Sequence, residues 1–196
     1  MNKREQQRLK RREQILNCGL DLMISKGYEA MQIRDIAKKL NISTGLFFNY
    51  FKSKENFYEE LIKIGVYGPG SVLKLNVEGI DPIELFEKIA DAIFEAFQRS
   101  PMTAKMFVLM SQTLQSKSVP DSVRKLIVGF DMITPIVPVI LKGQQLGEIK
   151  AGEPVFLAAA YWGAIQGIAE TAAARPDLSL PESGWAVDIL RKQPKA

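Results

Sequence analysis

The segment from Ile33 to Lys54, which reads IRDIAKKLNISTGLFFNYFKSK, restricts the fold of this chain more than any other stretch. Its first half repeats apolar residues at the spacing of one helical face, from Ile33 through Ile36 to Leu40. Asn41 suits the left-handed conformation that ends a helix, and Ser43 suits the N-cap of the next helix. The segment therefore predicts two short helices joined by a tight turn, which is a helix-turn-helix.

The second helix of this pair is predicted to run from Thr44 to Phe51 and is rich in aromatic residues. Phe47 and Phe51 are four residues apart, so they share one helical face and are expected to pack against the first helix. The opposite face, which includes Thr44 and Asn49, is then free to enter the major groove of DNA.

Charge is distributed unevenly along the chain. Residues 1–54 contain 12 Lys and Arg against 5 Asp and Glu, whereas residues 55–196 contain 14 against 17. A basic segment that coincides with a helix-turn-helix pattern indicates contact with a polyanion. The basic residues before position 13 are interpreted either as a flexible arm on DNA phosphates or, more commonly for such runs, as a solvated face.

The chain has one cysteine, Cys18, and no histidine. An intramolecular disulfide is therefore excluded, and so are the common zinc sites and the nucleophile pairs that depend on histidine. The basic start lacks the apolar core of a signal peptide, and no run of about 18 uncharged apolar residues follows. We expect a cytoplasmic protein with no metal, no cofactor, no catalytic residues and no membrane partner.

The motif Gly45-Leu46-Phe47-Phe48-Asn49-Tyr50-Phe51-Lys52-Ser53-Lys54 resembles the TetR family of bacterial transcriptional regulators. The resemblance is specific over about the first quarter of the chain. It implies an all-α dimer with an amino-terminal helix-turn-helix DNA-binding domain and a helical ligand-binding and dimerisation domain. The boundary is predicted after Lys54, which gives domains of residues 1–54 and 55–196.

The resemblance also implies a set of DNA-binding residues, although Leu46 and Phe48 replace the Thr and Tyr usual in the family. Asn49 is suited to pair with adenine edges, and a lysine near a helix amino terminus suits phosphate. The predicted DNA-binding residues are Arg34, Ser43, Thr44, Gly45, Leu46, Phe48, Asn49, Tyr50, Lys52 and Lys54.

The rest of the chain is predicted to form helices separated by Pro or Gly. The first helix of the chain should run from Glu5 to Lys26 and end at Gly27, and a joint between domains is expected at Gly65, Gly68, Pro69 and Gly70. Asp81 is expected to cap a helix that starts at Pro82. The later helices are predicted at residues 101–116, 120–133, 134–147, 153–174 and 181–193.

Three methionines four residues apart form a stripe that is interpreted as ordinary core or, given the family, as the lining of an inducer pocket. The predicted ligand-binding residues are Phe94, Phe97, Met102, Met106, Phe107, Met110, Met132, Trp162 and Gln166. Their apolar character favours a small hydrophobic ligand. Gly163 and Gly167, one helical turn apart, permit close packing either within one subunit or across a homodimer of the helices at residues 134–147 and 153–174.

The favoured function is a sequence-specific DNA-binding transcriptional regulator, specifically a repressor that leaves a palindromic operator when a small hydrophobic molecule binds. A homodimer agrees with this function because two reading heads about 34 Å apart meet successive major grooves on one side of DNA. The alternatives are a nonspecific DNA-packaging protein and an enzyme whose amino terminus only resembles the motif.

Overall fold

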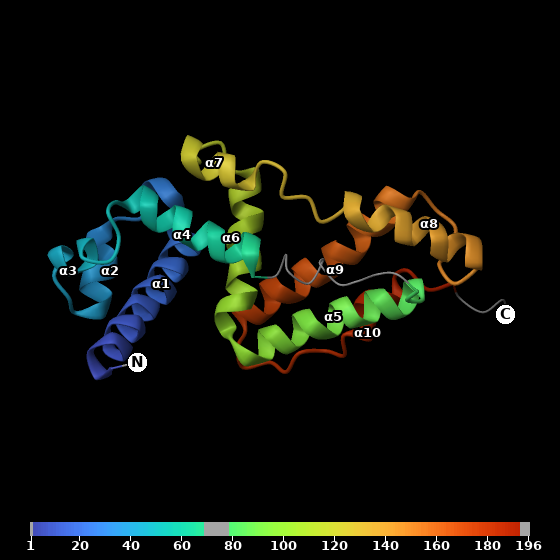
Figure 1. Cartoon of the computed structure of the whole chain (residues 1–196), viewed down its shortest axis with the longest axis horizontal. Coiled ribbons are helices and arrows are strands. Elements are labelled where there is room, and N and C mark those ends of the chain that lie inside the picture. Colours follow the sequence, from blue (N-terminus) through green and yellow to red (C-terminus); the bar gives the residue numbers. More distant parts are fainter. Residues whose placement is uncertain (1, 69–78, 193–196) are drawn as a thin grey trace. The chain divides into compact units, whose positions relative to one another are not determined.

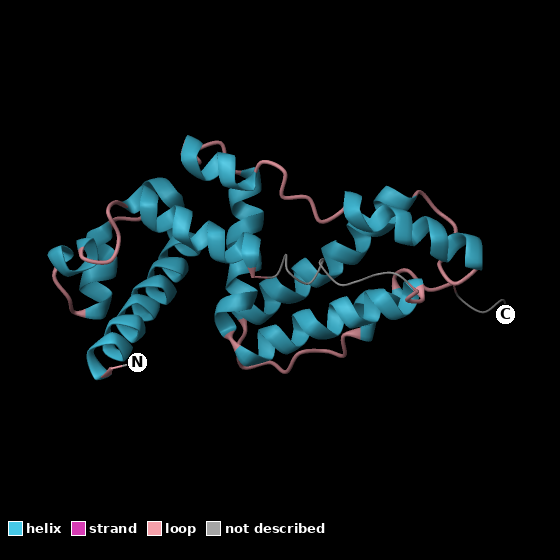
Figure 2. Cartoon of the chain, viewed as in Figure 1, coloured by secondary structure: helices cyan, strands magenta, loops and turns pink. Residues whose placement is uncertain are grey.

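The computed structural model describes residues 2–68 and 79–192, and it is helical throughout these ranges apart from turns and one isolated β-bridge (Figures 1 and 2). Pro69 and Gly70 of the predicted joint, and Gln193 at the end of the last predicted helix, lie outside the described residues. The helices are α1 (Lys3–Ala30), α2 (Ile33–Leu40), α3 (Thr44–Phe48), α4 (Lys54–Tyr67), α5 (Pro82–Arg99), α6 (Pro101–Gln115), α7 (Asp121–Ile127), the 3-10 turn η2 (Thr134–Ile136), α8 (Val137–Leu146), α9 (Pro154–Ala174) and α10 (Gly184–Asp188).

The chain divides into two compact units. The first comprises Met1–Val66 and Lys105–Gly129, and the second comprises Tyr67–Ala104 and Phe130–Ala196. The first unit thus contains the predicted DNA-binding domain together with α4, most of α6 and α7. The functional boundary after Lys54 stays a prediction.

The first unit is built around the buried face of α1, where Ile15, Leu20 and Met23 are almost fully shielded from solvent. Gly19 lies on this face, so close to α4 that a Cβ atom there would come within 2.2 Å of Phe57 Cζ. Cys18 is also buried in this helix, and burial raises the pKa of its thiol. The break at Gly27 was predicted, and the residue has φ 77° and ψ 169°.

Gly65 does not break α4, contrary to the prediction. It is buried within the helix, and a Cβ atom there would lie 2.7 Å from Met110 Sδ and 3.2 Å from Met106 Cγ. The missing side chain of Gly65 thus gives the methionines of α6 their packing space. Nearby, the Tyr58 hydroxyl donates to Thr113 Oγ1 at 2.7 Å, because the Thr113 hydroxyl itself donates to the Leu109 carbonyl at 2.6 Å.

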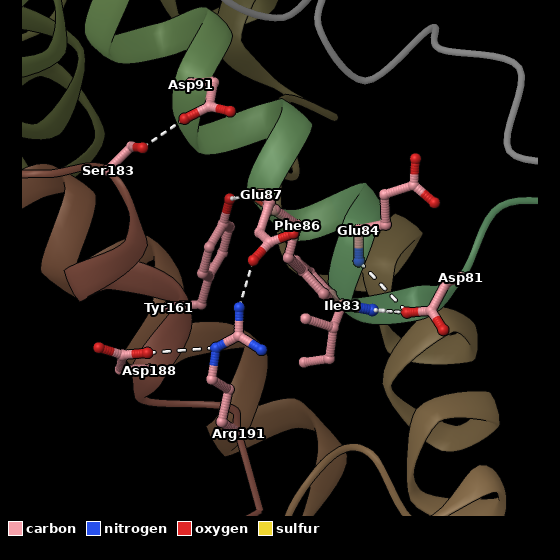
Figure 3. Close-up of polar contacts among 10 residues, drawn as sticks. All are labelled: Asp81, Ile83, Glu84, Phe86, Glu87, Asp91, Tyr161, Ser183, Asp188 and Arg191. Carbon is pink, nitrogen blue, oxygen red and sulfur yellow. Dashed lines mark hydrogen bonds and ion pairs between the residues drawn. The ribbon is translucent and has the colours of Figure 1, made fainter.

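The second unit is centred on α5 and α9. Asp81 caps α5 as predicted, by accepting from the N–H groups of Ile83 and Glu84 (Figure 3). The Tyr161 hydroxyl of α9 donates to the Phe86 carbonyl of α5 at 2.8 Å, and the two rings meet edge to face. Both side chains are fully buried.

The final segment is a correction to the predicted helix 181–193. Only α10 is helical, and the chain after it pairs antiparallel with residue 149, where Lys150 N–H donates to the Leu190 carbonyl at 3.0 Å. Arg191 then forms ion pairs with Glu87 and Asp188 (Figure 3). These tertiary contacts replace the hydrogen bonds that a longer helix would have supplied.

Two further helices are shorter than predicted. α7 ends at Ile127 instead of residue 133, because Gly129 takes φ 88° and Asp131 accepts from the N–H groups of Ile133 and Thr134 in a local turn. The helix predicted at 134–147 begins as the 3-10 turn η2, and it ends as expected with Gly147 in the left-handed conformation. α9 has the predicted extent.

Candidate nucleic-acid interface

The helix-turn-helix forms from local signals at each predicted position. α2 spans Ile33–Leu40, Asn41 has φ 51° and ψ 51°, and Ser43 Oγ accepts from the Leu46 N–H at 3.1 Å to cap α3. Asn41 is the only non-glycine residue with positive φ in the described ranges. The turn therefore uses the residue type that tolerates this conformation.

The start of α2 is fixed by charge as well as by backbone bonds. The Lys26 ammonium lies 2.9 Å from the Asp35 carboxylate, which also accepts from the Gln32 N–H at 3.1 Å. Together they hold the pKa of Asp35 below its ordinary value. The Asp35 carboxylate thus satisfies the Gln32 N–H at the start of α2. Its ion pair with Lys26 joins α2 to the end of α1.

An aromatic cluster supports α3 from behind. Phe47, Phe51 and Phe57 are almost fully buried, and their ring centroids are 4.9 to 5.6 Å apart. Edge and tilted aromatic contacts at these distances are favourable beyond the apolar area that they bury. The orientation of α3 therefore depends on the packing of these three rings against each other.

α3 itself is shorter than the predicted helix, which was expected to reach Phe51. After Phe48 the chain tightens, because the Tyr50 N–H bonds to the Phe47 carbonyl three residues back at 2.9 Å. Asn49 is consequently the C-cap of α3. Hydrogen bonds to the residue three positions back are common at the carboxyl end of a helix, where the last carbonyls lack the usual partner four residues ahead.

The outer face of α3 is open to solvent. Thr44, Gly45, Phe48 and Asn49 are exposed, with Phe48 exposing 51% of its surface. The other predicted DNA-binding residues lie around this face: Arg34, Ser43 and Lys52 are exposed, and Leu46, Tyr50 and Lys54 are half-buried. The structure thus gathers these residues on one unit, and their contact with DNA stays a prediction.

Lys54 contacts residues that could not be predicted from the sequence. Its ammonium donates to the Glu29 carbonyl at 3.3 Å and lies 4.3 Å from the centroid of the Tyr28 ring, which stacks on Tyr58. Partial burial lowers the pKa of Lys54. Since an ammonium has three donors, two remain for a phosphate. Tyr28 therefore positions the Lys54 ammonium. The break in α1 at Gly27 places the Tyr28 ring next to this lysine.

The predicted ligand-binding residues do not all belong to one unit. Met106, Phe107 and Met110 belong to the first unit and are buried, and the two methionines pack beside Gly65. The others lie in the second unit, where the Trp162 indole N–H donates to the Met132 carbonyl. The members in the second unit are Phe94, Phe97, Met102, Met132, Trp162 and Gln166.

A groove of about 600 Å³ on the second unit is lined by none of these predicted residues. It runs along α9 beside Gly163 and Gly167, and Trp185, which is 63% exposed, lies at its other side. A Cβ atom on either glycine would meet nothing within 4 Å. The alternative that these glycines serve packing within one subunit therefore finds no support in the described residues.

The comparisons with known proteins agree with this geometry. Residues 15–61, which include α2 and α3, match the sequence family described as bacterial regulatory proteins, tetR family. The amino-terminal region of this chain is therefore similar to the tetR family. The family and the named relatives are regulators of transcription and not enzymes, in agreement with the prediction.

Two curated relatives extend the match. The HTH-type transcriptional repressor KstR of Rhodococcus jostii is 32% identical over 97 residues, which cover 47% of this chain and 43% of KstR. The fatty acid metabolism regulator protein of Bacillus subtilis is 24% identical over 148 residues, 74% of each chain. This chain thus spans less than half the length of the KstR repressor.

Solved structures share the fold over nearly the whole chain. The tetR-family transcriptional regulator PfmR from Thermus thermophilus has a TM-score of 0.67 at 23% identity, and the match covers 92% of this chain and 99% of PfmR. A tetR-family regulator from Agrobacterium tumefaciens has a TM-score of 0.65 at 16% identity, with coverage of 94% and 99%. The predicted all-helical fold is confirmed. Within the described ranges, no helix is both long and apolar enough to cross a membrane.

Proposed function

We propose that this protein is a homodimeric tetR-family repressor that binds a palindromic operator through α3 and leaves it when a small hydrophobic molecule binds. The observation that carries the DNA-binding part is the exposed face of α3, which packs from behind against the buried cluster of Phe47, Phe51 and Phe57. Fixed orientation matters because base contacts discriminate only when the reading side chains are held in register with the groove.

The dimer is supported by the open face of α9. Phe156 exposes 75% and Val155 exposes 45% of their surfaces, and the bare glycines Gly163 and Gly167 lie further along the same helix. Large apolar side chains next to backbone without side chains suit close contact with a second helix. We assign this contact to a second copy of the chain, with α8 and α9 from each copy.

The proposed ligand is a small apolar molecule that binds in the second unit. The residues Phe94, Phe97 and Trp162 in the second unit are buried and aromatic, which suits an apolar molecule better than a sugar or nucleotide. A relative matched over 74% of its length is named a fatty acid metabolism regulator. Medium- and long-chain fatty acids are therefore the first probes to test for release of the protein from DNA.

The test of DNA reading begins with selection of bound duplexes from random DNA, followed by titration of the winner and of a scrambled duplex at fixed salt. We expect a palindrome with half-sites about one helical turn apart, bound roughly a thousandfold more tightly than the scramble. Weak binding that is equal for both duplexes would instead favour the DNA-packaging alternative.

Two substitutions then locate the site. Asn49→Ala is expected to cost about 1 to 3 kcal/mol on the operator only, because it removes a base contact. Lys54→Ala is expected to weaken binding to both duplexes and to reduce the salt slope by about 1, because it removes a phosphate contact. Lys150→Ala, at an exposed lysine of the second unit, is the control. If both site variants bind like the parent, α3 and the start of α4 do not form the interface.

A further inference from the structure

The amino-terminal basic residues form an ordered helix and not a flexible arm. α1 begins at Lys3, where Asn2 Oδ1 accepts from the Glu5 N–H at 2.9 Å and caps the helix. Arg4, Arg8 and Arg11 recur at spacings of four and three residues, so they share one face of this helix with two glutamines. Their charges are therefore held in a fixed line.

This face forms one wall of a groove with a volume of about 620 Å³. Leu46 and Tyr50, from α3 and the turn after it, line the same groove. The full lining contains four cationic side chains and no carboxylate: Arg4, Gln7, Arg8, Lys10, Arg11, Gln14, Leu46 and Tyr50. The groove thus lies directly beside the exposed face of α3.

The basic residues of α1 differ in whether they form ion pairs within the protein. Arg12 lies 2.6 Å from the Glu60 carboxylate of α4 and 5.3 Å from the centroid of the Phe51 ring, so it fastens α1 to the core. Arg4, Arg8, Lys10 and Arg11 form no ion pair with any residue in the described ranges. A concentration of positive charge without counterions in a groove attracts an anion.

We propose that this groove, here called the α1 groove, holds the phosphates of one DNA strand while α3 reads the adjacent bases. The inference rests on the proposed DNA-binding function and adds a second contact surface to it. Arg4 and Arg11 are separated by about 10 Å along the helix axis at 1.5 Å per residue. Each phosphate of a DNA strand carries one negative charge, so three arginines spread over this length can each bind one phosphate.

The test compares the parent with the triple variant Arg4→Gln, Arg8→Gln, Arg11→Gln by fluorescence anisotropy on the operator and on a scrambled duplex. Loss of three phosphate contacts should lower the magnitude of the log affinity against log salt slope by about 2.7. Between about 50 and 200 mM salt the triple variant should therefore lose roughly 40-fold less affinity than the parent loses. The loss at fixed salt should be similar on both duplexes, because phosphates carry no sequence.

Arg12→Gln is the matched control, since it removes the same charge from the same helix at a side chain held by Glu60. Its salt slope should equal that of the parent. If Arg12→Gln changes the slope as much as Arg8→Gln alone, net charge and not the α1 groove is responsible, and the proposal is wrong. A loss on the operator alone would also overturn it, because that result means base reading.

The same assay separates failure of this proposal from failure of the proposed function. A parent protein that binds no duplex refutes both. A parent that binds the operator and responds to Lys54→Ala as expected, with a triple variant that keeps the parental salt slope, refutes the α1 groove alone. Circular dichroism and the thermal midpoint confirm that each variant is folded, and the single variant Arg8→Gln, expected to change the slope by about 0.9, replaces the triple variant if that one unfolds.

Discussion

Substitution of Gly19 tests how tightly α1 packs against the other helices of the first unit. A methyl group at this position would lie 2.2 Å from Phe57 Cζ, 2.6 Å from Phe57 Cε1 and 3.1 Å from Ile36 Cδ1. Carbon atoms in contact are normally about 3.5 to 4.0 Å apart, so Gly19→Ala forces the Phe57 ring to move by more than about 1 Å. The ring is fully buried, and its centroid lies 5.6 Å from that of Phe47 and 4.9 Å from that of Phe51, so its movement disturbs both neighbours.

Two effects of this substitution oppose each other. Alanine in place of glycine in a helix interior stabilises by about 1 kcal/mol. Overpacking a well-filled core destabilises by about 1 to 3 kcal/mol, and a rigid ring places Gly19→Ala at or above the top of that range. The expected net loss is about 2 kcal/mol, which lowers the thermal midpoint of a chain of this size by about 4 to 8 °C. Operator affinity should fall as well, because Phe57 supports the back of α3.

The assay is thermal and urea unfolding, with Gly45→Ala as the control in the same domain. A Cβ atom at Gly45 meets only Ser43 Oγ at 3.8 Å, so this control should be as stable as the parent or slightly more so. Phe57→Leu completes a double-mutant cycle and should cost less stability beside Ala at position 19 than in the parent. A Gly19→Ala protein that melts at or above the parental midpoint would refute the packing argument.

Two further predictions concern the second unit. Burial raises the pKa of Tyr161 well above its ordinary value near 10. Above about pH 10 the unfolded chain therefore loses a proton that the folded chain keeps. The free energy of unfolding consequently falls as the pH rises. Tyr161→Phe should remove up to about 1.4 kcal/mol per pH unit of that fall, seen in urea midpoints between about pH 9 and 11, and an unchanged slope would contradict the assignment. Gly167→Leu fills open space on α9 and should shift the proposed dimer to monomer in analytical ultracentrifugation without loss of helicity. An unchanged sedimentation coefficient would remove α9 from the interface.

The sequence predicted structure well where the determining signals are local. The bounds of α2, the left-handed Asn41 and the caps at Ser43 and Asp81 all depend on a few adjacent residues, and each was confirmed. Predictions failed where distant residues decide. Gly65 looks like a helix breaker in isolation, but its partner Met110 lies 45 positions later and makes it a packing site.

The candidate site shows the same division. The exposed face of α3 follows from helical period and aromatic content, so its residues could be named in advance. The environment of Lys54 could not, because it requires the turn at Gly27 to bring Tyr28 and the Glu29 carbonyl to the start of α4. Likewise, the separation of Arg12 from its basic neighbours depends on Glu60, 48 positions further along the chain.

The thiol of Cys18 can report the opening of the first unit, because it is buried there and is the one cysteine of the sequence. The side chain is 6% exposed within α1, so an alkylating reagent can reach it only when the domain opens. When closing is fast compared with alkylation, the labelling rate measures the population of the open form directly. Because the chain contains no other cysteine, each modified molecule records one opening of this domain, and protection by added duplex gives the binding energy without any dye or tag.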